Sequence, residues 1–165
     1  MPRQIDYYFS LQSPWAYIGH ALFRDVVATY DLEVNHKPVV LVDLFSETGG
    51  QPLLKRHPVR QRYRMVELQR WRDKRGLQFK LQPANWPFNA RLADASGLPG
   101  QALVERSATD EISQKYEQNR QDALSVDVFG SPAYVLDGEV FWGQDRIELL
   151  ADALKSGRAP YRSQI

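Results

Sequence analysis

The chain begins with a short alternation of apolar and more polar residues, and a helical pattern follows it. Residues 5–10 (Ile-Asp-Tyr-Tyr-Phe-Ser) alternate with period two, which predicts a strand. Apolar side chains then recur at helical spacing from Pro14 to about Tyr30, which predicts a helix. A second strand is expected over residues 34–41, and Pro38 within it favours an edge strand or a strand end.

The middle of the chain is patterned as helices separated by loops. Residues 48–52 (Thr-Gly-Gly-Gln-Pro) have the composition of a loop. Val59, Tyr63 and Val66 form one helical stripe, with Met65, Leu68 and Trp71 beside it, so we expect a helix to about Arg75 that Gly76 ends. Further helices are expected near residues 100–106 and 110–126.

The last part of the chain returns to strands. Residues 133–136 and 139–142 flank Asp137-Gly138, a dipeptide typical of a two-residue hairpin turn. Asp145 is then expected to cap a final helix. The order of elements is strand, helix, strand, helical block, hairpin and helix, which predicts an α/β fold with a helical insertion.

Composition and charge limit the classes of function. The 165 residues are 43% hydrophobic and 12% aromatic, which is enough for one domain with a sizeable core. The net charge is only +1, so nothing attracts the whole chain to nucleic acid or to an acidic membrane. Neither a signal peptide nor a membrane-spanning apolar run is found, and we expect a cytoplasmic protein.

The chain contains no cysteine. It therefore has no thiol of its own for redox chemistry, for a disulfide or for a thiolate-metal site. His20, His36 and His57 show no metal-ligand spacing, so no metal site is expected.

Ser13-Pro14-Trp15-Ala16 stands where the first strand gives way to the first helix. Ser13 suits the N-cap, because its oxygen can accept a backbone N–H of the first turn, and Pro14 suits the first helical position. A second role is open to the same hydroxyl. A helix N-terminus stabilises a thiolate, and a hydroxyl there can donate a hydrogen bond to the sulfur anion of a bound ligand.

Several motifs occur in a fixed order along the chain. Ser-Pro-aromatic at the first helix is followed by residues 48–52, then by residues 128–132 (Val-Phe-Gly-Ser-Pro) and residues 142–146 (Trp-Gly-Gln-Asp-Arg). Together they resemble the 2-hydroxychromene-2-carboxylate isomerases and the related kappa-class glutathione transferases, in the DsbA-like branch of the thioredoxin superfamily. The resemblance covers nearly the whole chain.

The resemblance implies a DsbA-like architecture with two parts. Residues 1–42 and 127–156 would form a discontinuous thioredoxin-like core, and residues 43–126 an inserted helical subdomain. Relatives have a longer helical block than this chain, which is shortened near residues 90–92. A site without that block would exclude water less well.

The resemblance also implies that glutathione binds at the start of the first helix. Ser13 corresponds to the serine credited with activating glutathione, and the Ser131 backbone would pair with the cysteinyl part, as in β-augmentation. The implied glutathione-binding residues are Gln51, Arg60, Ser131, Pro132, Gln144 and Asp145. Three of these positions have an ordinary alternative: a turn at Ser131-Pro132, a helix cap at Asp145, and a solvated basic face around Arg60.

The resemblance places four further residues near a second substrate: Trp15, Tyr17, Asn85 and Trp86. Their aromatic rings could equally belong to the core or to a subdomain interface. Gly50 departs from the pattern, because kappa-class relatives have an asparagine there that contacts glutathione. Gln51 is the candidate substitute.

The resemblance implies a glutathione-dependent isomerase of an aromatic or other conjugated organic acid. The same site would serve a kappa-class-like glutathione transferase, which is the first alternative. The second is a thioredoxin-fold binding module without catalysis, which Gly50 and the shortened block favour. Such relatives are commonly dimeric, so we expect a homodimer that acts on a small molecule.

Overall fold

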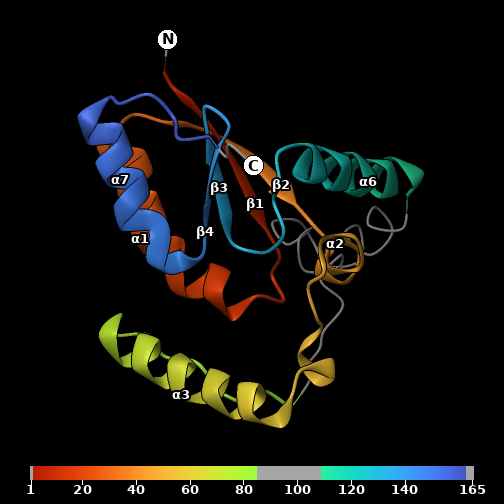
Figure 1. Ribbon diagram of the computed structural model, residues 1–165. Coiled ribbons are helices and arrows are strands. Elements are labelled where there is room, and N and C mark those ends of the chain that lie inside the picture. Colours follow the sequence, from red (N-terminus) through yellow and green to blue (C-terminus); the bar gives the residue numbers. More distant parts are fainter. Residues whose placement is uncertain (1, 85–108, 163–165) are drawn as a thin grey trace.

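The structure is a computed structural model that describes residues 2–84 and 109–162 (Figure 1). In these residues four strands form one sheet, in the order β2-β1-β3-β4. The strands are β1 (Gln4–Phe9), β2 (Glu33–Pro38), β3 (Ala133–Leu136) and β4 (Glu139–Trp142). β1 and β2 are parallel, while β3 pairs antiparallel with both β1 and β4. A helix joins the parallel strands β1 and β2, and a tight turn joins the antiparallel strands β3 and β4, as the chain pattern predicted.

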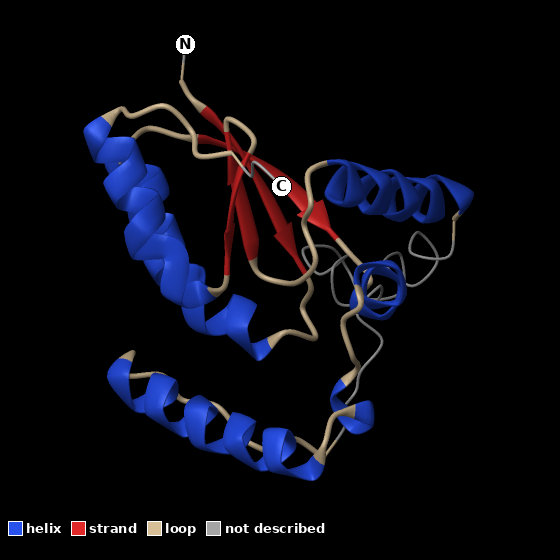
Figure 2. Cartoon of the chain, in the orientation of Figure 1, coloured by secondary structure: helices blue, strands red, loops and turns tan. Residues whose placement is uncertain are grey.

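Helices cover both faces of the sheet (Figure 2). The helices are α1 (Pro14–Thr29), α2 (Leu41–Thr48), α3 (Pro58–Lys74), α6 (Asp110–Ser125) and α7 (Ile147–Ser156), with the 3-10 turns η1 (Leu53–Lys55) and η2 (Gln144–Arg146). α1 and α7 lie together on one face, and α2 and α6 lie on the other (Figure 1). α3 stands away from the sheet, below the first turns of α1. The expected α/β architecture is confirmed.

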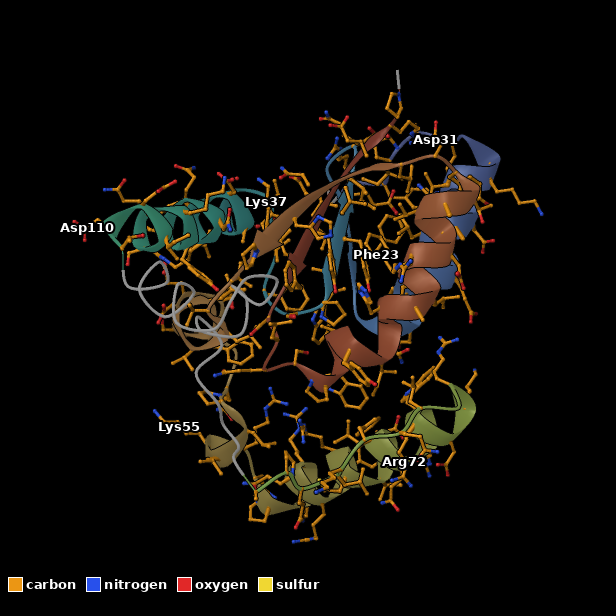
Figure 3. The ribbon with its side chains drawn as sticks, turned by 180° about the vertical axis from the view of Figure 1, so that it is seen from behind. Phe23, Asp31, Lys37, Lys55, Arg72 and Asp110 are labelled. Atoms are coloured by element: carbon orange, nitrogen blue, oxygen red, sulfur yellow. The ribbon has the colours of Figure 1, made fainter. Side chains whose placement is uncertain are left out.

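The larger core lies between the sheet and the α1–α7 layer. The rings of Tyr7 and Tyr134 are stacked with their centroids 5.2 Å apart, and the Phe23 ring lies 4.6 Å from that of Tyr134. Phe23 points from α1 toward the sheet (Figure 3). Ile147 and Leu150 of α7 are fully buried in the same cluster. This layer fixes the N-terminus of α1 relative to the sheet.

A second core lies between the sheet and α6. Ala123 of α6, Ala133 of β3 and Leu44 of α2 are fully buried there. Lys37 of β2 reaches the Asp122 carboxylate on α6, with Nζ 2.6 Å from Oδ2 (Figure 3). The expected division of the chain at residues 42 and 126 remains a prediction, but α6 lies within the expected insertion and forms a layer of the sheet domain.

The second strand is shorter than its pattern predicted. β2 ends at Pro38, which lacks the N–H needed to continue the ladder, and it is the edge strand beside β1. The prediction of a strand to Leu41 was therefore wrong, because Leu41 begins α2. A helix of only eight residues shows too little periodicity to be separated from the strand pattern before it. α2 ends at Gly49, whose φ of +75° is easy only for glycine.

α3 is present where it was expected, but its apolar stripe does not face the core. Val59, Tyr63 and Val66 are exposed in the part of the chain that the structure describes. The buried residue of α3 is Leu68, which is 2% exposed. Leu68 therefore marks the inner side of α3. Apolar spacing predicted the helix but not which of its sides faces the rest of the fold.

The hairpin is confirmed residue for residue, and the cap of the last helix is not. Asp137 and Gly138 both have positive φ, at 51° and 80°, as a two-residue hairpin turn of this kind requires. Asp145 lies inside η2, and its Oδ2 accepts a hydrogen bond from Arg146 at 2.7 Å instead of capping the helix. α7 begins after Arg146 without a side-chain cap. The helix expected near residues 100–106 lies outside the described residues.

Candidate active site

Ser13 caps α1 and also holds the segment before β3. Its side chain is buried, its Oγ accepts the Ala16 N–H at 3.4 Å, and its hydroxyl donates to the Ser131 carbonyl oxygen at 3.0 Å. The capping role is confirmed. The Ser13 hydroxyl proton is directed at the Ser131 carbonyl oxygen. A peptide N–H of a bound ligand could donate to the same oxygen and displace the hydroxyl from it.

Ser131 is bound to its surroundings through both its side chain and its backbone. The Ser131-Pro132 peptide bond is cis. Ser131 Oγ accepts the buried Ser10 N–H at 2.9 Å, so the side chain ties this segment to the end of β1. The Ser131 backbone N–H makes no hydrogen bond with the described residues. That N–H and the neighbouring carbonyl are the pair of groups with which an extended peptide can form strand-like bonds.

Three cavities adjoin one another between the sheet domain and α3. The first, which we call the η2 cavity, has a volume of about 260 Å³. Its walls include Gln144, Asp145 and Arg146 from η2 and Glu67 and Trp71 from α3. Carboxylates and a guanidinium occur together here, so the cavity suits a ligand group that carries both charges.

The second cavity, the central cavity, lies directly over Ser13 and has a volume of about 270 Å³. Ser13, Trp15 and Ser131 line it on the side of the sheet domain, and Arg56 and Arg64 line it on the side of η1 and α3. Most of its remaining wall is apolar: Leu41, Val42, Phe45, Pro52, Leu53 and Leu54. No acidic side chain of the described residues lines it.

The third cavity, the Tyr17 cavity, has a volume of about 430 Å³ and shares Ser13 and Arg64 with the central cavity. Tyr17 and Phe79 meet in its wall edge to face, with ring centroids 5.9 Å apart. Leu68 adds to this wall, and again no described acidic residue does so. A cavity with this lining suits a flat apolar molecule.

Arg64 is a charged group whose surroundings disfavour its charge. Burial and the nearby positive charge of Arg56 both lower the pKa of the Arg64 guanidinium from its ordinary value. Arg56 Nε donates to the Gln51 carbonyl oxygen at 2.8 Å. Neither arginine forms an ion pair with a described residue. The pair leaves positive charge at a partly buried place, which favours an anion.

Most of the residues expected at the site are brought together. Ser13, Trp15, Ser131, Gln144 and Asp145 line the η2 cavity, the central cavity or both, and Tyr17 lines the third. Pro132 is fully buried beside them. Arg60 and Gln51 are exposed and line none of the three cavities, so their roles stay predictions. Asn85 and Trp86 lie outside the described residues.

Sequence reasoning missed Arg56, Arg64, Trp71 and Trp142 as wall residues. A signal for two of them was present. Arg64, Leu68 and Trp71 are spaced four and three apart, so they share one side of α3, and Leu68 marks that side as the inner one. Apolar spacing placed Leu68 and Trp71 beside the main stripe, but it did not connect them with Arg64, because Arg64 is charged.

Gly50, where relatives were expected to have an asparagine, is required here by packing. A Cβ on Gly50 would lie 2.8 Å from Cγ of Phe45. The Phe45 ring occupies this space and lines the central cavity. The Phe45 ring makes the wall of the central cavity apolar at this position.

In the described ranges 2–84 and 109–162, no helix is long and apolar enough to cross a membrane. Those ranges also hold no cluster of three His, Cys, Asp or Glu side chains that could bind a metal ion.

Comparison with curated proteins gives relatives of one name. The 2-hydroxychromene-2-carboxylate isomerase of Pseudomonas putida is 25% identical over 192 residues, covering 91% of this chain and 93% of the relative. That of Pseudomonas sp. strain C18 is 26% identical over 201 residues, covering 97% and 93%. Both alignments are longer than the 165 residues of this chain, so the relatives have residues without a counterpart here.

Comparison with solved structures supports the fold. A structure of 2-hydroxychromene-2-carboxylate isomerase superposes with a TM-score of 0.75 at 21% identity, covering 93% of this chain and 95% of the other. A probable DsbA oxidoreductase from Streptomyces coelicolor superposes with a TM-score of 0.71 at 16% identity, covering 98% and 93%. The family model described as DSBA-like thioredoxin domain matches residues 4–94 and 87–155. With a cis-proline segment beside a helix N-terminus, and matches across most of its length, the chain belongs to the DSBA-like thioredoxin domain family.

Proposed function

We propose that this protein is a glutathione-dependent isomerase of an aromatic or other conjugated organic acid. The curated relatives are named as isomerases of such an acid and align with nearly the whole chain. The observation that carries the proposal is the buried Ser13 hydroxyl, which lies at the N-terminus of α1 and 3.0 Å from the Ser131 carbonyl oxygen. In a chain without cysteine, the ligand must supply the thiol.

The residues around Ser13 fit the three parts of glutathione. The γ-glutamyl end carries an ammonium and a carboxylate, and the η2 cavity offers Glu67 and Asp145 for the first and Arg146 for the second. The Ser131 N–H and carbonyl fit the main chain of the cysteinyl part. Arg56, in the wall of the central cavity, fits the glycyl carboxylate.

Ser13 would hold the sulfur anion. Its proton is donated to the Ser131 carbonyl in this structure, and a ligand N–H that binds the same oxygen would leave the hydroxyl able to turn toward sulfur. The N-terminus of the α1 dipole adds positive partial charge at the same place. When bound, glutathione would supply a thiolate that adds reversibly to a conjugated carbon of the acid and is eliminated after the bond has rotated.

The first experiment is the substitution Ser13→Ala. We expect kcat for glutathione-dependent isomerisation to fall about 100-fold, as for the loss of a hydrogen-bond donor to a developing anion. The free energy of unfolding should fall by only about 1 kcal/mol, since Ser13 is also an N-cap. Steady-state assays with the purified wild type and variant measure kcat, and urea denaturation measures the free energy of unfolding.

Ser10→Ala is the matched control. Ser10 is a buried serine three residues earlier that lines none of the three cavities, so its loss should leave kcat within about twofold of the wild type. Undiminished kcat in Ser13→Ala would refute the proposed role. A stable glutathione conjugate in the product would favour the transferase alternative. No rise in the melting temperature at millimolar glutathione would favour the non-catalytic binding module.

A further inference from the structure

Arg56 and Arg64 are two positive charges in one cavity, and residues 2–84 and 109–162 provide neither with a negative partner. Both line the central cavity, and both are only partly exposed. Across the described residues neither has a carboxylate within ion-pairing distance. Two like charges held this way repel each other and lose hydration, and the cost falls when anions bind.

The charges of the three cavities divide the site into two halves. The η2 cavity has acidic Glu67 and Asp145 in addition to Arg146. The charged side chains of described residues in the central and Tyr17 cavities are all basic, namely Arg56, Arg64 and Lys80. A zwitterionic group therefore suits the first half, and anionic groups suit the second.

The two arginines differ in which space they face. Arg56 lines the central cavity and not the Tyr17 cavity, whereas Arg64 lines both. In the Tyr17 cavity Arg64 adjoins an apolar part of the wall that includes Tyr17, Leu68 and Phe79, and it is the charged group that this cavity shares with the central cavity, whereas Lys80 lines the Tyr17 cavity alone. An acid with a flat apolar body would lie against that wall with its carboxylate at Arg64.

We infer that Arg64 is the specificity-determining residue of this site and that it binds the carboxylate of the second substrate. The inference rests on the proposed function, in which Arg56 binds the glycyl carboxylate of the tripeptide. The two arginines, which have no acidic partner among the described residues, would then bind two carboxylates: the glycyl carboxylate at Arg56 and that of the second substrate at Arg64. The protein selects conjugated acids over neutral compounds of the same shape, because an uncharged group at Arg64 would leave a desolvated cation unpaired.

A binding experiment without glutathione tests the inference separately from the chemistry. Coumarin-3-carboxylate and its uncharged ethyl ester are titrated by fluorescence into the wild type, Arg64→Gln and Arg62→Gln. We expect Arg64→Gln to weaken binding of the acid by about tenfold or more and to change binding of the ester by less than about twofold. Arg62→Gln removes the same charge from an exposed position of α3 and should change neither.

Arg64→Lys separates charge from geometry. Lysine keeps the positive charge but cannot form the paired hydrogen bonds of a guanidinium, so we expect a loss of acid binding between those of the wild type and Arg64→Gln. Far-ultraviolet circular dichroism shows that each variant is folded. If Arg64→Gln and Arg62→Gln bind the acid equally well, Arg64 does not bind the carboxylate and the inference is overturned.

Glutathione and its glycyl monoethyl ester identify which carboxylate each arginine binds. Arg56→Gln should weaken the binding of glutathione more than the binding of its ester. Arg64→Gln should leave the affinities for both ligands within about twofold of the wild-type values. The reverse result would assign Arg64 to the tripeptide and overturn the inference. If the wild type binds no glutathione, the proposed function fails, while the coumarin titration still reports on Arg64.

Discussion

The Ser13 hydroxyl makes two hydrogen bonds that differ in how far they could be foreseen. The bond from the Ala16 N–H is local, so a serine before a proline at a helix start predicts it. The bond to the Ser131 carbonyl joins residues 118 positions apart and depends on the pairing of β1 with β3. Sequence can identify such a residue as a candidate, but the direction of its proton is a property of the folded chain.

Gly50 gives a prediction that concerns a single side chain. We expect Gly50→Asn, which introduces the residue expected in kappa-class relatives, to lower the free energy of unfolding by about 1–3 kcal/mol. The reason is the Phe45 ring, whose Cγ would lie 2.8 Å from the new Cβ. Urea denaturation of the wild type and the variant measures the difference.

Phe45→Ala provides the control for this clash. If the ring causes the loss, Gly50→Asn should cost much less in a chain that already has alanine at position 45, so the two substitutions would be strongly coupled. Equal costs in both backgrounds would show that Phe45 does not restrict this position.

At the scale of elements, the site depends on α3, a helix with few contacts to the rest of the fold. Its inner side contributes to the wall of each cavity: Trp71 to the η2 cavity, Arg64 to the central cavity, and Arg64 and Leu68 to the Tyr17 cavity. Sequence located the helix, because a helical pattern of apolar residues runs up to Gly76. It did not identify the inner side, because few residues of α3 are buried and the apolar residues on its outer side gave the clearer period.

Leu68→Ala tests whether that inner side fixes α3. Because Leu68 is 2% exposed and is the buried residue of this helix, we expect its truncation to cost about 2 kcal/mol or more. The loss should be local, so amide hydrogen exchange should become faster in α3 while the sheet stays protected. Glutathione should also bind more weakly, because Glu67 and Trp71 move with the helix.

Val66→Ala is the matched variant on the same helix. Val66 is 42% exposed, so its truncation should change stability by less than about 0.5 kcal/mol and leave exchange in α3 unaltered. Unaltered exchange in Leu68→Ala as well would mean that α3 is fixed by contacts other than Leu68.

At the scale of the whole molecule, the segment after α7 is attached to the β3–β4 hairpin through the Glu139 carboxylate and through the Asp137 and Gly138 carbonyl oxygens, which accept hydrogen bonds from Arg162 at 2.7 and 2.8 Å. Glu139 of β4 accepts two hydrogen bonds from the Arg158 guanidinium, at 2.7 and 2.8 Å, and a third from the Tyr161 N–H at 2.9 Å. The hairpin was predictable from Asp137-Gly138, since turn geometry is a local property. This attachment was not, because it joins residues about twenty positions apart through side chains that carry no periodic pattern.

The same carboxylate makes stability depend on pH. The hydrogen bonds from Arg158 lower the pKa of Glu139 below its ordinary value of 4.5. A carboxyl group whose pKa is lowered by folding stabilises the protein above its unfolded pKa, and this stabilisation is lost as pH falls through the folded value. We therefore expect the wild type to lose stability below about pH 4.5, and Glu139→Gln to be less stable at neutral pH but less sensitive to acid. Urea denaturation from about pH 3 to about pH 7 measures both effects. Glu148→Gln, at an exposed position of α7, should follow the wild-type curve, and a Glu139→Gln curve parallel to it would show that Glu139 does not contribute to the acid transition.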